Sequence, residues 1–97
     1  MTPELLYDIR NYLDITWEDS DTDTKITGII NRGMAYLNKR TGADLDFAEE
    51  ADARALLFDY CRYAWSNALE DFKVNFLSEI IDLQLNESVK NYETTEV

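Results

Sequence analysis

The segment from Glu50 to Leu69 limits the possible folds most strongly, because its apolar residues recur with the spacing of one helix face. Phe58 and Trp65 lie one heptad apart beside that face and widen the apolar surface. A helix this apolar, about five turns long, needs several other elements to cover it. The segment therefore predicts the central helix of an all-α domain, with an apolar face formed by Leu56, Leu57, Tyr60, Cys61, Ala64, Ala68 and Leu69.

Three other segments repeat the helical spacing and predict shorter helices around the central one. They cover residues 3–13, 21–40 and 74–86, and we place the break before the last of them at residues 71–73. The predicted fold class is an all-α, four-helix bundle-like domain over residues 1–86. The polar C-terminal tail, residues 87–97, is expected to be flexible and disordered in the isolated chain.

Glycines and short polar runs mark how these helices meet. Gly33 falls on the apolar stripe of the second helix, where the missing side chain would let another backbone approach closely. Gly42 is expected to end that helix in the left-handed conformation, and Ser20 or Asp21 to cap its start. In the acidic connection that follows, Leu45 and Phe47 are expected to dock the chain against the core.

The charge balance argues against a conventional nucleic-acid-binding role. The chain has 20 acidic and 9 basic residues, a net charge of −11. Affinity for nucleic acids comes largely from Lys and Arg contacts to phosphates. The charge therefore indicates a solubilising surface, a surface that repels DNA, or one that imitates it.

The residues that most enzymes and cofactor sites use are missing. The chain has no histidine and a single cysteine, Cys61, which is expected to be a small core residue. Asp19, Asp21 and Asp23 have the spacing that begins a calcium loop, but Thr24 stands where the loop needs glycine. We expect no enzymatic activity, no cofactor and no metal. No apolar run reaches membrane-spanning length, and the first residues do not form a signal peptide.

Interaction with other proteins is the function class that remains, and many tyrosines and tryptophans suit it. The order of features resembles that of the small head–tail connector proteins of long-tailed bacteriophages and prophages. The resemblance covers residues 3–85. It rests on the acidic turn at 14–21, the segment Ala35-Tyr36-Leu37-Asn38-Lys39-Arg40-Thr41-Gly42, the segment Ala53-Arg54-Ala55-Leu56-Leu57, and the helix starting at Phe76-Leu77-Ser78-Glu79-Ile80-Ile81.

Membership of that family would imply a structural head completion (adaptor) protein. Such a protein is made in the bacterial cytoplasm and resides in the virion at the head–tail interface. It forms a homo-oligomeric ring of about a dozen copies beneath the portal protein. The ring extends the channel through which DNA passes without specific binding, and it docks the downstream stopper or tail completion protein.

Two groups of residues are candidates for these contacts. Between subunits, basic residues of one copy would face an acidic connection of the next; the candidates are Lys39, Arg40 and Arg62 against Asp44, Asp46 and Glu49. Leu85, Val89 and Tyr92 are candidates for contact with the portal. The alternative function is an acidic inhibitor that imitates DNA and occupies a host nucleic-acid-binding protein.

Overall fold

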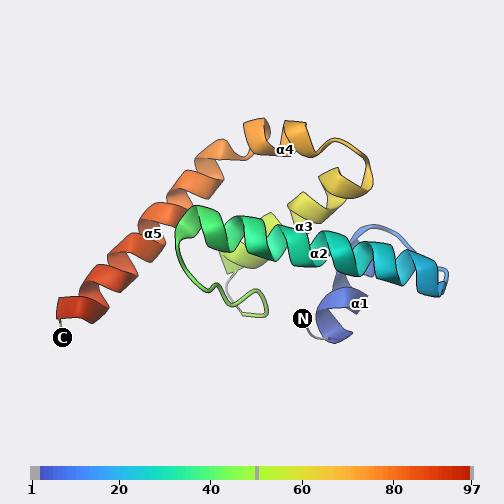
Figure 1. Ribbon diagram of the computed structural model, residues 1–97, viewed down its shortest axis with the longest axis horizontal. Helices are drawn as coiled ribbons and strands as arrows, with labels where there is room; N and C mark the ends of the chain where they lie inside the picture. Colours follow the sequence, from blue (N-terminus) through green and yellow to red (C-terminus); the bar gives the residue numbers. More distant parts are fainter. Residues whose placement is uncertain (1–2, 50, 97) are drawn as a thin grey trace.

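The chain folds into five α-helices, as the computed structural model shows for residues 3–49 and 51–96, with side chains described up to Lys90 except at Ala51 (Figure 1). The helices are α1 (Pro3–Tyr12), α2 (Ser20–Thr41), α3 (Ala51–Trp65), α4 (Leu69–Asn75) and α5 (Leu77–Glu96). This part of the chain contains no β-strand. The predicted all-α class is therefore confirmed.

Helices α2 and α3 make the most extensive contact between two helices in the described part of the chain, and the other helices are placed around this pair. Figure 1 shows α1 near one end of α2 and α5 crossing near the other end. The molecule is elongated, with extents of 49 × 28 × 17 Å and a radius of gyration of 14.3 Å. A compact domain of this length has a radius of about 12–13 Å. The core combines all five helices with two connections and is formed by Leu5, Ile9, Ile15, Ile26, Ile29, Ile30, Leu37, Leu45, Phe47, Ala53, Leu56, Leu57, Tyr60, Cys61, Phe72, Ile80 and Leu83.

At Gly33, side chains of α3 pack directly against the backbone of α2. A Cβ atom at this position would lie 2.8 Å from Leu57 Cδ1 and 2.8 Å from Tyr60 Cδ1. Both neighbours are buried, so neither can move aside freely. The sequence predicted that another backbone would approach here; the atoms next to Gly33 instead belong to side chains of α3.

Three helices end at a residue in the left-handed conformation. Gly42 (φ 68°) ends α2 as predicted, whereas Asp14 (φ 59°) and Asn67 (φ 58°) take the same conformation without being glycine. After α3, the Ala68 N–H donates to the Tyr63 carbonyl at 2.8 Å and the Asn67 N–H donates to the Ala64 carbonyl at 3.1 Å. This hydrogen-bond pattern closes a helix end. It ends α3 at Trp65, several residues before the predicted end, and the break predicted at residues 71–73 lies inside α4.

The boundary between α4 and α5 is a bend at Phe76, which has φ −111° and ψ 16°. The ring of Phe76 stacks on that of Phe72 with centroids 5.0 Å apart, and it meets the edge of Tyr63 at 5.6 Å. Beyond the bend, α5 runs to Glu96, whereas the sequence predicted a helix ending near residue 86. The tail therefore continues α5, and its disorder in the isolated chain stays a prediction.

Replacing Gly33 with alanine should destabilise the fold, although alanine is the better helix former by about 1 kcal/mol. The added Cβ would overpack Leu57 and Tyr60, which costs about 1–3 kcal/mol. Gly28→Ala is the matched control on the same helix, because its Cβ would meet only the mobile end of Arg32, at 3.2 Å. In urea unfolding, Gly28→Ala should have a larger free energy of unfolding than the parent chain, and Gly33→Ala a smaller one. The reverse order would contradict the close approach.

Cys61 is fully buried on α3, as predicted, and burial raises the pKa of its thiol from 9.0 to about 12. At a pH between these two pKa values, the thiol of the unfolded chain loses its proton while that of the folded chain keeps it. The free energy of unfolding should therefore fall as pH rises. At pH 10, one unit above the pKa of the unfolded chain, the free energy of unfolding should be lower by about 1.4 kcal/mol. Unfolding in urea at pH 8 and pH 10 under reducing conditions measures it. Cys61→Ala lacks the titrating group, so an equal pH dependence in that variant would contradict the assignment.

Candidate interaction surface

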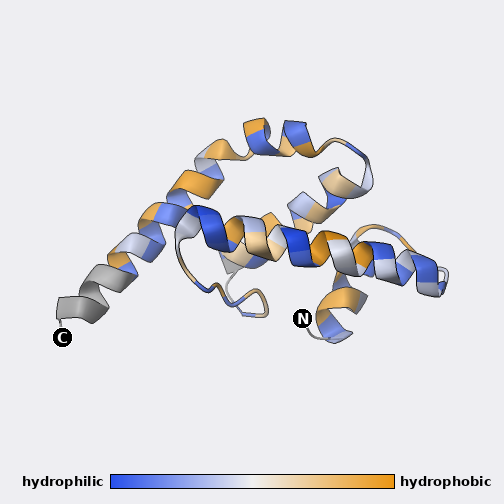
Figure 2. Ribbon diagram, in the orientation of Figure 1, coloured by the Kyte–Doolittle hydropathy of each residue, from blue (hydrophilic) through white to orange (hydrophobic). Residues whose placement is uncertain are grey.

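An apolar ridge runs along the outer face of α5 and has no partner within the described part of the chain. Leu77, Ile81, Leu85 and Val89 recur every fourth residue, with side chains 55%, 43%, 58% and 55% exposed. Figure 2 shows the apolar positions at the start of α5. Residues at this spacing lie one above another on a helix. Ile80 and Leu83, on the opposite side of α5, are buried in the core. The ridge is therefore a second apolar face on a helix that already has a buried one.

A cationic pocket borders one side of the ridge. Lys39 and Arg40 at the end of α2 and Lys73 on α4 line it around the ring of Tyr36, and its volume is about 460 Å³. The Arg40 guanidinium carbon lies 5.2 Å and the Lys73 Nζ 5.5 Å from the centre of that ring. Both are within the range of cation–π attraction. We call this site the basic pocket; its floor and rim are completed by Leu77, Ile80, Ile81 and Gln84.

The charges of the basic pocket have no ion-pair partner among the described residues. The ion pairs among the described residues join Arg10 to Asp23, Arg54 to Asp8, Arg62 to Asp59 and Lys90 to Glu87. None of them includes a cation of the pocket. In a chain with only 9 basic residues, three unpaired cations in one place form a concentrated positive site.

An acidic groove lies on the other side of α5, between that helix and α3. Its volume is about 210 Å³, and Asp52, Asp59, Glu79 and Asp82 line it together with Ala55, Leu56, Phe76 and Leu83. Of these four carboxylates, Asp59 has partners among the described residues: it pairs with Arg62 at 3.5 Å and accepts a hydrogen bond from the Tyr12 hydroxyl at 2.7 Å. That hydrogen bond to a carboxylate raises the pKa of Tyr12. We call this site the acidic groove.

The predicted subunit-contact residues fall into separate places. Lys39 and Arg40 lie in the basic pocket, whereas Arg62 lies in a different depression with Tyr63, Ser66 and Ala68. Its guanidinium sits over the Tyr63 ring at 5.2 Å. The candidate cations therefore lie in two separate places on one copy. Arg62 projects from α3 near Asp59, which holds it there.

The acidic connection after α2 is exposed and tightly anchored. Asp44, Asp46 and Glu49 are exposed, while Leu45 and Phe47 are buried, as predicted. Figure 1 shows this connection on one side of α2, with α4 on the other.

Hydrogen bonds between side chains and backbone groups fix this connection in place. The Asn38 side-chain oxygen accepts from the Leu45 N–H at 3.0 Å, and Arg54 donates to the Phe47 carbonyl at 3.2 Å. Asp46 accepts from the Ala48 N–H at 3.0 Å, so part of its capacity serves the turn. Arg54 also pairs with Asp8 at 2.6 Å.

Two of the three predicted portal-contact residues, Leu85 and Val89, lie on the exposed ridge. The side chain of Tyr92 lies outside the described residues. Sequence reasoning missed Lys73 and the acidic groove. The spacing of Glu79 and Asp82, and that of Asp52 and Asp59, could each have indicated one acidic helix face.

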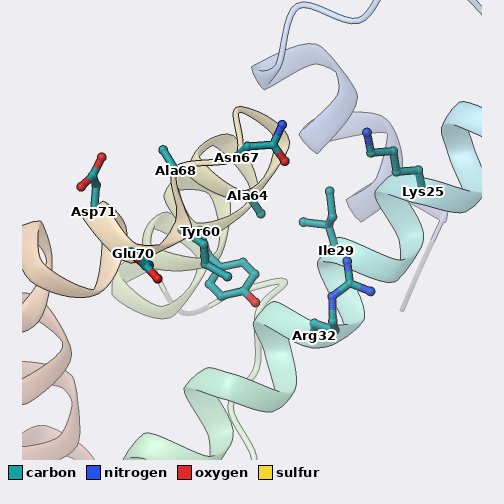
Figure 3. Close-up of a pocket in the computed structure, with 10 residues that line it drawn as sticks. Lys25, Ile29, Arg32, Tyr60, Ala64, Asn67, Ala68, Glu70 and Asp71 are labelled. Carbon is teal, nitrogen blue, oxygen red and sulfur yellow. The ribbon is translucent and has the colours of Figure 1, made fainter.

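A hollow of about 530 Å³ lies between α2 and the turn from α3 to α4 (Figure 3). Figure 3 shows Lys25 and Arg32 on the α2 wall, with Glu70 and Asp71 on the opposite wall. The Lys25 Nζ lies 4.9 Å from the Trp65 ring centre. Opposite charges on opposite walls of an open depression do not converge on one point, which a substrate or metal site would require.

Within residues 3–49 and 51–96, no three acidic or cysteine side chains gather where they could hold a metal ion. Asp19, the start of the calcium-like spacing, instead caps α2: it accepts from the Asp21 N–H at 3.4 Å and from the Thr22 hydroxyl at 2.9 Å. None of the described helices has the length and apolar character needed to cross a membrane.

Comparison with known proteins identifies no relative: no protein-family model, curated protein or solved structure matches the chain.

The ridge should be free of stabilising contacts within one copy. Leu85→Ala should change the free energy of unfolding by less than about 0.5 kcal/mol. The matched substitution Leu83→Ala, two positions earlier on α5, removes a side chain that is 4% exposed. It should cost about 2–4 kcal/mol. Thermal and urea unfolding of both variants measure the difference. Equal losses would show that α5 buries its outer face within one copy.

Proposed function

We propose that the chain is a structural head–tail connector, a head completion or adaptor protein of a tailed bacteriophage or prophage. The observation that carries the proposal is the exposed apolar ridge on α5. A soluble chain rarely exposes a continuous apolar helix face unless another protein covers it. The resemblance described for residues 3–85 supplies the kind of assembly in which such a face would be used.

In this role the chain forms a ring beneath the portal and lengthens the DNA channel. A net charge of −11 suits a wall past which DNA must slide without binding. The exposed acids of the connection after α2, Asp44, Asp46 and Glu49, are available for such a wall. The protein would act through shape and charge rather than catalysis, and would remain in the virion between the head and the tail-side completion protein.

The far half of α5 is the part we assign to the portal. Figure 1 shows this half extending away from α2 and the rest of the body. Leu85 and Val89 are 58% and 55% exposed on it. A protruding helix with apolar residues on one face can lie in a groove of a partner protein.

Replacing Leu85 and Val89 together by aspartate should abolish portal binding while leaving the fold intact. Burying two carboxylates in an apolar contact should weaken binding by about 100-fold or more. The assay mixes the chain with the portal oligomer encoded by the same phage, and follows mass by light scattering and shape by negative-stain imaging. The parent chain should add one tier to the portal.

The control is Tyr7→Asp, because Tyr7 is also exposed (63%) but lies on α1. It should bind the portal as the parent chain does. A parent chain that ignores the portal, or an aspartate variant that binds it equally well, would overturn the proposal.

A second candidate function is favoured by the acidic groove. Asp52, Asp59, Glu79 and Asp82 bring four carboxylates together at the surface, as an imitation of a phosphate backbone would require. An inhibitor of this kind would be displaced from its host target by duplex DNA and by salt. Displacement by DNA distinguishes it from the connector, whose portal contact through the ridge should be insensitive to DNA.

A further inference from the structure

We propose that copies of this chain associate head to tail, with the acidic groove of one copy against the basic pocket of the next. The two sites have opposite charge, and both border the exposed ridge of α5. Only the ring that repeated pairing would build rests on the proposed function. The pairing itself is argued from the two sites.

The helical repeat puts the two sites on opposite sides of α5. Leu77 and Gln84, which line the basic pocket, lie on one side. Glu79 and Asp82, which line the acidic groove, lie on the other. At about 100° per residue, Glu79 is rotated by roughly 200° from Leu77 around the helix axis. The helix stands between the two sites, so they cannot neutralise each other within one copy.

Both sites have charge left over for a partner. Lys39, Arg40 and Lys73 take part in none of the ion pairs among the described residues. The same holds for Asp52, Glu79 and Asp82. Opposed patches of unpaired charge steer association and fix its register.

The ridge supplies the apolar centre that such a contact needs. Ile81 lines the basic pocket and is 43% exposed, and Leu77 beside it is 55% exposed. The Tyr36 ring lies between the cations of the pocket. An apolar centre containing an aromatic residue and arginine, with charges at the rim, is the usual composition of a protein interface.

The charge pattern also excludes one geometry of the contact. In an antiparallel two-fold pairing of α5 helices, each acidic side would face the acidic side of its partner, and like charges would repel. A head-to-tail contact uses two different surfaces and matches opposite charges at every repeat. Such a contact leaves one unused surface at each end, so it continues until a ring closes or the partners run out.

The experiment uses charge reversal on each site of the full chain. The first variant carries Lys39→Glu and Lys73→Glu in the basic pocket, and the second carries Glu79→Lys and Asp82→Lys in the acidic groove. Light scattering and sedimentation across a concentration series, up to about 1 mM, report self-association. The control for the basic-pocket variant carries Lys25→Glu and Arg32→Glu, which lower the net charge by the same amount but line the hollow between α2 and the turn from α3 to α4.

The parent chain and the control should self-associate with weakening at high salt, whereas each site variant should remain monomeric. An equimolar mixture of the two site variants should associate again, because each retains one natural site and carries one reversed site that fits the other variant. Folding of each variant is checked by circular dichroism.

Three outcomes would overturn the inference: a parent chain that stays monomeric throughout, site variants that associate as the parent does, or a mixture that stays monomeric. The portal assay with Leu85 and Val89 replaced is decided separately. Pairing without portal binding would leave this inference standing and remove the proposed function. Portal binding without pairing would do the opposite.

Discussion

The packing of α2 directly against α3 is the contact on which the rest of the molecule depends. It is possible because Gly33 leaves no side chain between the helices, so that Leu57 and Tyr60 fill the space instead. Tyr60 in turn meets the edge of Phe72 on α4 at 5.5 Å, and Tyr36 on α2 lies 5.8 Å from Tyr60. The position of α4, and through it the start of α5, therefore follows from a contact made by a residue without a side chain. The positions of the basic pocket and the acidic groove therefore also depend on this contact.

The periodicity of apolar residues was enough to predict the all-α class and helices close to α1 and α2, because each helix must present one continuous stripe to a shared core. It did not predict α4, whose residues were divided between the predicted central helix, the break at 71–73 and the last predicted helix. Gly42 and Cys61 could also be assigned from sequence, since a left-handed helix end favours glycine and a lone cysteine on an apolar face is usually buried. The end of α3 could not be predicted from the sequence. Asn67 adopts the left-handed conformation at an energetic cost that tertiary packing must offset, and asparagine occurs in many other settings. The bend at Phe76 has no glycine or proline and is made by stacking on Phe72.

The interaction surfaces divide in the same way. Lys39 and Arg40 are neighbours in sequence at a helix end, so their grouping was predictable. Lys73 joins them only because α4 folds back over Tyr36, which depends on the break at Asn67. The acidic groove likewise combines residues of α3 and α5 that no local pattern connects. Arg62 lies apart from Lys39 and Arg40, and its carboxylate partner, Asp59, is one turn away on the same helix at 3.5 Å.

The bend at Phe76 makes α5 a lever. The helix has 20 residues and is thus about 30 Å long. A rotation of about 10° at the bend would displace its far end by about 5 Å, over a helix of that length. The bend itself is held in place, because the Phe76 N–H donates to the Phe72 carbonyl at 3.0 Å and because Ile80 and Leu83 on α5 are buried in the core. Any change in the angle at Phe76 would shift Ile80 and Leu83 within the core, so the packing around the bend sets where the far end of α5 stands.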